Sequence, residues 1–128
     1  MLVRQIADPK LAQFAYLVGC PRSGEAIVID PGRDVAQYVD VAKAEGLRIV
    51  ASTETHIHAD FVSGSRELAD REGAKLYLSD TGPSDWKYKY AKDYDSKLLH
   101  DGDTFHIGNV KFDVMHTPGH TPESISFV

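Results

Sequence analysis

Two histidines and an aspartate at alternate positions, His56, His58 and Asp60, are the residues whose types and spacing most clearly indicate chemistry. In an extended segment side chains alternate between faces, so all three would lie on the same side of the chain. Nitrogen and carboxylate ligands together suit zinc or ferrous iron better than calcium. A lone histidine at a strand end is usually an ordinary polar residue, but this pattern, directly after an apolar strand, predicts a metal site.

A second histidine cluster contains His116 and His120, which are separated by Thr-Pro-Gly. The Pro-Gly pair predicts a rigid turn that presents His120 at a fixed angle. Such a turn beside a strand end is a place from which a third ligand can converge on the first two. We interpret His116 as a loop residue or as one that supports a ligand, rather than as a ligand itself.

The other chemically versatile side chains match no ligand pattern. His100 and His106 flank the Asp-Gly-Asp turn at 101–103, and we expect neither to touch a metal. The single cysteine, Cys20, precedes a proline in a predicted hairpin turn. This position favours a structural thiol over a catalytic one, and one cysteine cannot form an internal disulfide.

The elements that must position these residues alternate between strands and helices. Helical spacing of apolar residues predicts helices over 35–45 and 63–71, with Asp34 as a cap of the first and with Gly46 and Gly73 at their ends. Strands are predicted at 14–18, 26–29, 47–51, 74–78, 104–107, 111–115 and 124–128, with turns at 19–24 and 108–109 and a long loop at 79–97. This order predicts an α/β or α+β domain in which helices cover a mixed sheet.

Composition limits the partners and the compartment. The 128 residues are 42% hydrophobic, which suits one globular domain. The net charge of −5, without a long Lys/Arg cluster, argues against a nucleic-acid partner. No apolar run approaches the roughly 18 residues of a membrane span, and no apolar signal segment begins the chain, so we expect a cytoplasmic protein. The apolar ending at 125–128 has no turn or polar tail, which favours an N-terminal fragment.

Three motifs together resemble the metallo-β-lactamase superfamily: Thr-His-Ile-His-Ala-Asp at 55–60, Thr-Pro-Gly-His-Thr at 117–121, and Val-Ile-Asp-Pro-Gly at 28–32. The longer stretches at 55–64 and 116–124 resemble its persulfide dioxygenase branch, in particular bacterial members with rhodanese domains after the catalytic one. Glyoxalase II hydrolases are similar as a sibling branch. The resemblance runs through the whole chain and implies that residues 1–128 are the N-terminal portion of an αβ/βα sandwich, with a mixed sheet and covering helices.

The resemblance also implies a set of site residues. His56, His58 and His120 are implied to be metal ligands or to line the metal site. In the dioxygenase branch one iron is held by residues that match His56 and His120 and by a later aspartate, which would fall beyond the end of this chain. His58 and Asp60 are then expected beside the iron, as ligands or as catalytic residues that orient the ligands or a bound water. Asp30 is expected to brace the loop that carries the ligands.

Phe61 departs from the pattern of dinuclear relatives, which have a histidine at this position. A phenyl ring cannot bind a second metal, so Asp60 loses its expected co-ligand. The departure favours a mononuclear site and weakens the hydrolase interpretation, since such hydrolases commonly use two metals and a bridging hydroxide.

The resemblance implies that the intact protein is an enzyme that uses mononuclear Fe(2+) to oxidise a low-molecular-weight, glutathione-like persulfide to sulfite. One alternative is a hydroxyacylglutathione (thioester) hydrolase of the glyoxalase II type, with Zn(2+). Another is a catalytically inactive metal-binding fragment, because the later carboxylate is absent. If the chain supplies only the first sheet of the sandwich, one apolar sheet face would be exposed. We then expect it to pair as a homodimer, to exchange elements with another copy, or to belong to a longer chain.

Overall fold

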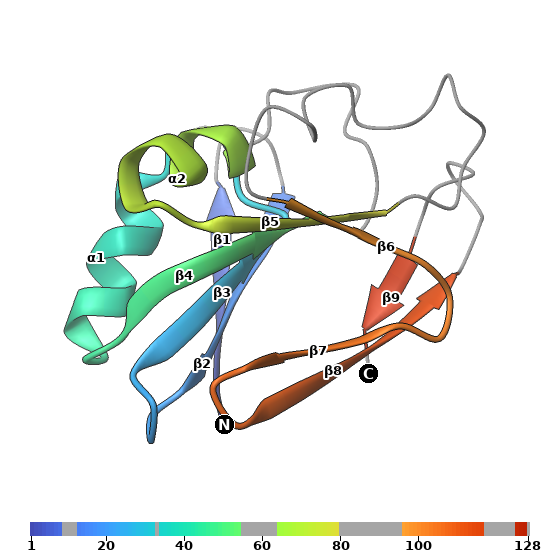
Figure 1. The fold of residues 1–128 in the computed structure, drawn as a ribbon. Coiled ribbons are helices and arrows are strands. Elements are labelled where there is room, and N and C mark those ends of the chain that lie inside the picture. Colours follow the sequence, from blue (N-terminus) through green and yellow to red (C-terminus); the bar gives the residue numbers. More distant parts are fainter. Residues whose placement is uncertain (9–12, 33, 55–63, 80–95, 117–124, 128) are drawn as a thin grey trace.

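The computed structural model describes residues 1–8, 13–32, 34–54, 64–79, 96–116 and 125–127. These residues form two sheets, with helices on the outer face of the larger one (Figure 1). In chain order the described elements are β1 (Leu2–Asp8), β2 (Gln13–Cys20), β3 (Glu25–Ile29), α1 (Ala36–Ala44), β4 (Arg48–Thr53), α2 (Ser65–Glu72), β5 (Lys75–Ser79), β6 (Ser96–Leu99), β7 (Thr104–Ile107), β8 (Val110–His116) and β9 (Ile125–Phe127).

The larger sheet contains β1 to β6 in their chain order. β1, β2 and β3 pair antiparallel, whereas β3 to β6 run parallel, so the sheet is mixed, as the sequence predicted. α1 lies between β3 and β4 in the chain, and α2 lies between β4 and β5, because parallel neighbours require a crossover connection. The carboxyl ends of β3 and β4 therefore meet at one edge of the sheet, where Ile29 pairs with Thr53.

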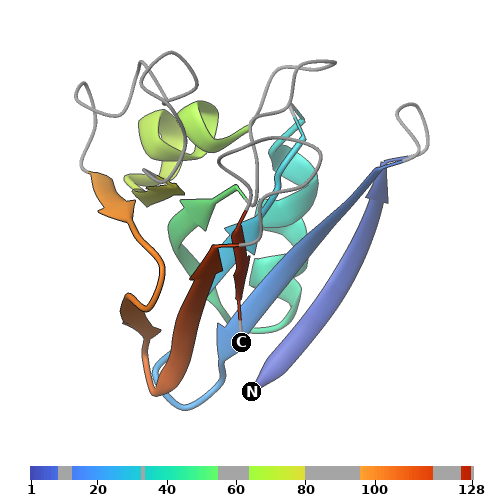
Figure 2. The ribbon, with the colours of Figure 1, turned by 90° about the vertical axis from the view of Figure 1, so that its right-hand side faces the viewer.

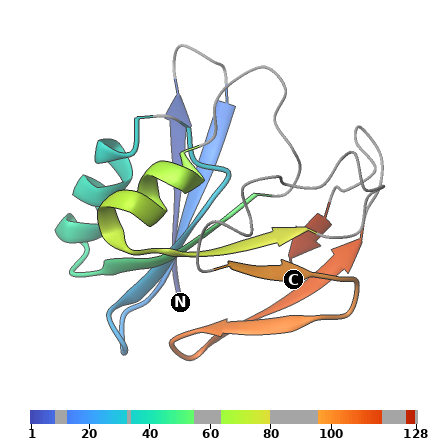
Figure 3. The same ribbon diagram turned by 45° about the horizontal axis from the view of Figure 1, so that its top comes forward.

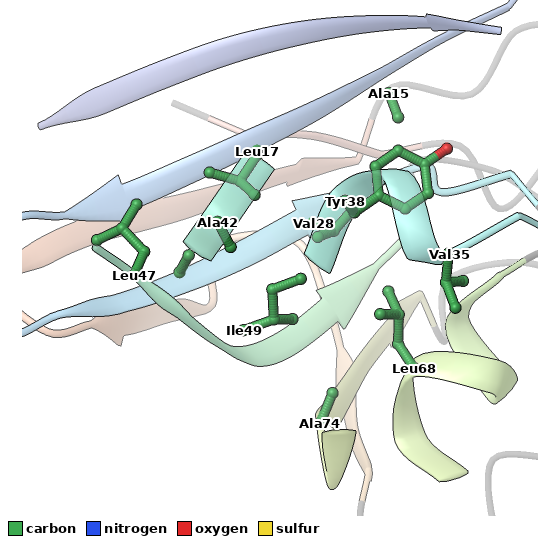
Figure 4. Packing of buried hydrophobic residues seen from close by; sticks show 11 residues of the cluster. Ala15, Leu17, Val28, Val35, Tyr38, Ala42, Leu47, Ile49, Leu68 and Ala74 are labelled. Carbon is green, nitrogen blue, oxygen red and sulfur yellow. The ribbon is translucent and has the colours of Figure 1, made fainter. Parts of the chain in front are cut away.

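Apolar side chains between the helices and the larger sheet form the first core cluster. Figure 4 shows Tyr38 and Ala42 of α1 among strand residues that include Leu17 and Val28. Leu68 of α2 belongs to the same cluster and is completely buried. Burying a side chain of this size contributes roughly 1.5–3 kcal/mol. Because isolated helices this short are unstable in water, the cluster rather than helix propensity holds both helices in place.

The smaller sheet, with the order β7-β8-β9, covers the opposite face of the larger sheet (Figures 1 and 2). Phe105 and Phe112 from its hairpin stack on each other at 5.0 Å between ring centroids. Phe105 also stacks on Tyr77 of β5 at 4.2 Å, which ties the two sheets together. This second core cluster also buries Ile27 and Leu99 of the larger sheet.

Most predicted elements are confirmed, with small shifts of their ends. Gly46 and Gly73 have φ angles of +72° and +68°, as expected for residues that follow a helix. The prediction that Asp34 caps the first helix is wrong, because the cap position is Val35 and no side chain caps the helix there. Two strands were missed. β1 was not predicted, and β6 begins at Ser96 inside the stretch predicted as a long loop; residues 80–95 of that loop lie outside the described residues.

The expectation of one open sheet face is only partly right. The chain supplies strands of both sheets, so the smaller sheet already covers much of the inner face. An apolar hollow of about 330 Å³ is left between β1–β3 and β8, lined by Met1, Val3, Tyr16, Val18, Ile29, Val110, Lys111 and Phe112. In the described part of the chain, neither helix has the length and apolar character to cross a bilayer.

Candidate metal centre

The four residues predicted to form the metal site lie outside the described residues. His56, His58 and Asp60 belong to the stretch 55–63, called here the histidine segment, and His120 belongs to the stretch 117–124. Among the residues that the structure does describe, no group of three or more His, Cys, Asp or Glu side chains could hold a metal ion. The structure describes the framework on both sides of each stretch, and this framework would position the predicted ligands.

The two residues that flank the histidine segment are buried. Glu54, which precedes it, is 1% exposed, and Gly64, which follows it, is also buried. On the first side it continues from β4, a central strand between β3 and β5, and on the second side it leads into α2 (Figure 3). In open α/β sheets the carboxyl ends of parallel strands form the usual binding edge. The segment therefore starts where the fold favours a site.

The N-terminal side of the segment is fixed by hydrogen bonds at Thr53. Its carbonyl oxygen accepts the N–H of Asp30 at 2.8 Å, which extends the contact between β3 and β4 beyond the last strand residue. Its hydroxyl donates to the carbonyl oxygen of Tyr77 in β5 at 2.5 Å. Thr53 is completely buried. The chain thus enters the segment from a position held by both neighbouring strands.

The C-terminal side is fixed by close backbone packing at Gly64. Its N–H donates to the carbonyl oxygen of Pro31 at 3.0 Å. A Cβ atom on Gly64 would lie 2.0 Å from the carbonyl oxygen of Gly32, so no other residue fits without a backbone shift. The next residue, Ser65, is completely buried, and its hydroxyl is 2.8 Å from that of Ser52 in β4. α2 therefore starts at a fixed point on the sheet.

One turn, formed by Asp30, Pro31 and Gly32 and called here the brace, contacts both sides of the segment. Asp30 has a φ of +55°, an unusual conformation for a residue other than glycine. Aspartate and asparagine tolerate it better than most residues. The hydroxyl of Tyr38 accepts the N–H of Gly32 at 2.7 Å, and this bond connects the brace to α1. The prediction that Asp30 braces the loop agrees with its backbone contact to Thr53, while a role for its side chain stays a prediction.

The second stretch, which carries His120, connects two paired strands. β8 ends at His116, which pairs with Ile125 of β9 in an antiparallel register. The expectation that His116 is a loop residue is wrong for its backbone, which belongs to β8. Near the end of β8, the Val114 carbonyl oxygen accepts the N–H of Gly102 at 2.9 Å, and the Val114 N–H donates to the carbonyl oxygen of Asp103 at 2.8 Å.

The remaining candidates, His100, His106 and Cys20, lie in the described part of the chain, and the prediction that none of them takes part in a metal site stays a prediction. His100 and His106 are exposed, and Nδ1 of His100 lies 3.5 Å from a carboxylate oxygen of Asp103 in the turn. Cys20 is the last residue of β2 and only 4% exposed. Hydrogen bonds from the Ser23 side chain and the backbone N–H of Asn109 lower the pKa of the Cys20 thiol to about 7. The thiol contacts the β2–β3 turn and the β7–β8 turn, which lie at the opposite end of β3 from the brace.

The donor set fits a divalent transition metal by its chemistry. Three imidazoles and a carboxylate are ligands that both Fe(2+) and Zn(2+) accept.

The sequence interpretation did not assign roles to Gly64, Tyr38 or the pair of Ser52 and Ser65. A glycine directly after the histidine segment was a usable clue. The other contacts join residues distant in the chain, which no local pattern reveals.

Comparisons with known proteins agree with this fold and with these motifs. The sequence profile described as "Metallo-beta-lactamase superfamily" matches residues 8–128. The solved structure of a metallo-beta-lactamase from Staphylococcus aureus subsp. aureus COL superimposes with a TM-score of 0.94 at 46% identity, covering 99% of this chain and 37% of that one. A structure described as ETHE1 from Myxococcus xanthus superimposes with a TM-score of 0.85 at 29% identity, covering 100% of this chain and 53% of that one.

Among curated relatives, the chain is similar to the mitochondrial persulfide dioxygenase ETHE1 of Bos taurus. The two are 33% identical over 100% of this chain and 48% of the relative. It is also similar to the hydroxyacylglutathione hydrolase of Nitrosococcus oceani, at 36% identity over 94% of this chain and 44% of the relative. The chain thus spans about half the length of the curated relatives it matches.

Proposed function

The chain belongs to the metallo-β-lactamase superfamily, and we propose that its protein is a persulfide dioxygenase that uses one ferrous iron. The observation that carries the proposal is the likeness to persulfide dioxygenases over the full length of this chain. The family fold supports a metal-dependent reaction in general terms. The persulfide substrate, the iron and the metal count are the proposal.

The proposed ligands are His56 and His120, with His58 beside the metal as a further ligand or a lining residue. Bound iron would supply the redox chemistry that lets dioxygen oxidise a sulfane sulfur. In the overall reaction one persulfide, one dioxygen and one water give one thiol and one sulfite, with release of two protons. The outer sulfur of the persulfide is oxidised, dioxygen is reduced, and the sulfur–sulfur bond breaks.

The chain's own residues have positioning and proton-transfer roles in this proposal. Asp60 and His58 would orient the ligands and accept hydrogen bonds from water in the site, because a carboxylate and a neutral imidazole nitrogen are both hydrogen-bond acceptors. Phe61 cannot bind a second metal. The brace would keep the histidine segment in place while substrate and product exchange.

A second candidate, hydrolysis of a glutathione thioester, is favoured by the likeness to the Nitrosococcus oceani hydrolase. The two candidates differ in metal count and in co-substrate. The hydrolase would use two metals and a bridging hydroxide and would not consume dioxygen. The dioxygenase needs one iron and takes up dioxygen in proportion to sulfite.

The direct test follows dioxygen uptake and sulfite formation from glutathione persulfide, with iron-loaded protein. We expect wild-type protein to make one sulfite per dioxygen consumed, and His56→Ala and His120→Ala to lose at least ~100-fold in rate because ligand loss removes the metal. His100→Ala and His106→Ala are the matched controls, because both side chains are exposed, and they should retain full activity. Thioester hydrolysis without dioxygen uptake would replace this proposal with the second candidate.

A further inference from the structure

We propose that Tyr38 of α1 is a positioning residue for the metal site, acting through the brace on both ends of the histidine segment. The inference rests on the proposed function only in that it presupposes metal binding by this segment. It assigns a role to a core residue with no chemistry of its own at the metal. A continuous set of contacts runs from the tyrosine hydroxyl through the brace to both flanks of the segment.

The first step is the contact between Tyr38 and the brace. The Tyr38 hydroxyl accepts the N–H of Gly32 at 2.7 Å, and both residues are buried. Figure 4 shows the tyrosine ring inside the core cluster between α1 and the sheet, with the hydroxyl at the edge of that cluster. The ring is therefore fixed by packing, and the hydroxyl is a rigid acceptor. A buried N–H needs such an acceptor, because no water replaces it.

The second step is the reach of the brace to both flanks. At one flank the Asp30 N–H donates to the Thr53 carbonyl oxygen at 2.8 Å. At the other flank the Pro31 carbonyl oxygen accepts the Gly64 N–H at 3.0 Å. These two contacts come from neighbouring residues of one turn, so a shift of the brace displaces the two ends of the histidine segment together.

The third step is the tightness of the contact between the two glycines. Gly64 approaches the carbonyl oxygen of Gly32 so closely that a Cβ atom would lie 2.0 Å from it. Gly32 is the residue whose N–H bonds to Tyr38. Motion at the tyrosine bond is therefore passed directly to the start of α2. Metal ligands tolerate distance errors of only about 0.2 Å, so a small shift is enough to weaken binding.

The test replaces the hydroxyl alone, with Tyr38→Phe, and uses Co(2+) as the probe. Cobalt affinity is measured by competition with a chelator, and the ligand-field absorption spectrum reports ligand geometry. We expect cobalt affinity to fall about 10-fold, the lower end for residues that support a ligand, with shifted ligand-field bands. Tyr16→Phe is the matched control: its exposed hydroxyl accepts the Gln5 side-chain N–H at 3.3 Å on β1–β2, so affinity and spectrum should not change.

A second control separates positioning from general loss of stability. Ala42→Gly weakens α1 one helical turn after Tyr38. Ala42 belongs to the same core cluster as Tyr38 but does not contact the brace. It should lower the free energy of unfolding while leaving the cobalt spectrum unchanged. Equal spectral changes in Ala42→Gly and Tyr38→Phe would overturn the proposal, as would wild-type affinity and spectrum in Tyr38→Phe.

The wild-type protein provides a test that does not depend on the folding of any variant. Coupling between two sites is reciprocal, so cobalt must protect the brace as much as the brace favours cobalt. We expect saturation with Co(2+) to slow hydrogen exchange at the Gly32 amide and to leave the Gly24 amide unchanged; the latter bonds to the Cys20 carbonyl oxygen in the β2–β3 turn. Unchanged exchange at Gly32 contradicts the inference.

These results distinguish failure of the inference from failure of the proposed function. If His56→Ala abolishes cobalt binding and Tyr38→Phe has no effect, the metal site stands and the positioning role of Tyr38 is wrong. If wild-type protein binds no cobalt, or if His56→Ala binds as wild type does, the metal site itself is wrong and the inference fails with it.

Discussion

Two glycines, Gly64 and Gly108, pack closely against other segments of the protein at opposite ends of β3. The physical requirement for glycine differs between the two positions. Gly64 has an ordinary φ of −80° and is required by space, because a Cβ atom would meet the Gly32 carbonyl oxygen. Gly108, in the β7–β8 turn, has a φ of +57°, and its Cβ atom would lie 2.1 Å from the Ser23 hydroxyl oxygen. The first contact holds a flank of the histidine segment, whereas the second joins the two sheets. Close packing therefore does not identify a functional site until the connected segments are known.

The surroundings of the two contacts differ as well. Around Gly64 the polar partners are buried: the hydroxyls of Ser52 and Ser65 bond to each other, and Thr53 bonds to β5. Around Gly108 the backbone N–H bonds to a carboxylate oxygen of Glu25, which is partly exposed. We expect changes near Gly64 to affect metal binding and stability together, and changes near Gly108 to affect stability alone.

The largest effect is expected from Gly64→Ala. The added methyl meets a backbone oxygen that cannot move aside cheaply, so the free energy of unfolding should fall by about 3 kcal/mol, and metal affinity by at least ~10-fold. Urea unfolding and metal titration measure the two. The control is Gly19→Ala, whose methyl would meet the flexible end of the Leu47 side chain; it should cost about 1 kcal/mol and leave metal affinity unchanged. Wild-type metal affinity in Gly64→Ala would contradict the expectation that close packing at Gly64 supports metal binding.

Gly108→Ala is expected to lower the free energy of unfolding by about 2 kcal/mol, because it adds both a crowded methyl and a left-handed backbone penalty. The hairpin turn should separate from the β2–β3 turn, and metal affinity should stay at the wild-type value. The same urea and metal titrations check this. A drop in metal affinity as large as that of Gly64→Ala would remove the distinction between the two ends of β3.

Ser65→Ala tests the buried hydroxyl pair beside Gly64. Loss of this bond should lower the free energy of unfolding by about 1 kcal/mol and metal affinity less than Gly64→Ala does. The double variant with Ser52→Ala should be less destabilised than the sum of the single variants, because no hydroxyl is then left without its partner. Additive effects in urea unfolding would show that the pair does not help to fix the start of α2.

The smallest effect at neutral pH is expected from ionisation of Cys20, beside Gly108. The Ser23 side chain and the Asn109 N–H lower the pKa of the thiol to about 7 from the usual 9.0. A lowered folded-state pKa stabilises the fold above the unfolded pKa and loses that contribution as pH falls through the folded pKa. The stability of wild type relative to Cys20→Ala should therefore increase from pH 7 to pH 9, with no change in metal affinity. A pH-independent difference in urea midpoint would contradict this assignment.

Much of the fold could be predicted from the sequence because local patterns determine it. Apolar runs mark β3 and β5, and helical spacing with a following glycine marks α1 and α2. β1 escaped prediction because it is an edge strand: Leu2 and Ile6 face the core, but Val3 is 47% exposed, so apolar residues do not alternate cleanly. β6 is four residues long and exists by pairing with β5, a non-local contact.

In the candidate site, too, local patterns could be predicted from the sequence and non-local contacts could not. The ligand types at 56, 58, 60 and 120 could be proposed from spacing and from the family resemblance. The framework could not, because it joins Gly32 to Gly64 and Thr53 to Tyr77 across the chain. Helical spacing places Tyr38 in α1, but nothing in the pattern reveals that its hydroxyl bonds to the brace.

The most direct test of the central claim is the metal content of protein purified anaerobically, counted per chain, for wild type and for His56→Ala, His120→Ala and the control His106→Ala. We expect one iron per chain in wild type and in His106→Ala, and loss of that iron in the other two variants. Two metals per chain in wild type, or metal content unaffected by His56→Ala and His120→Ala, would contradict a mononuclear site built on these histidines.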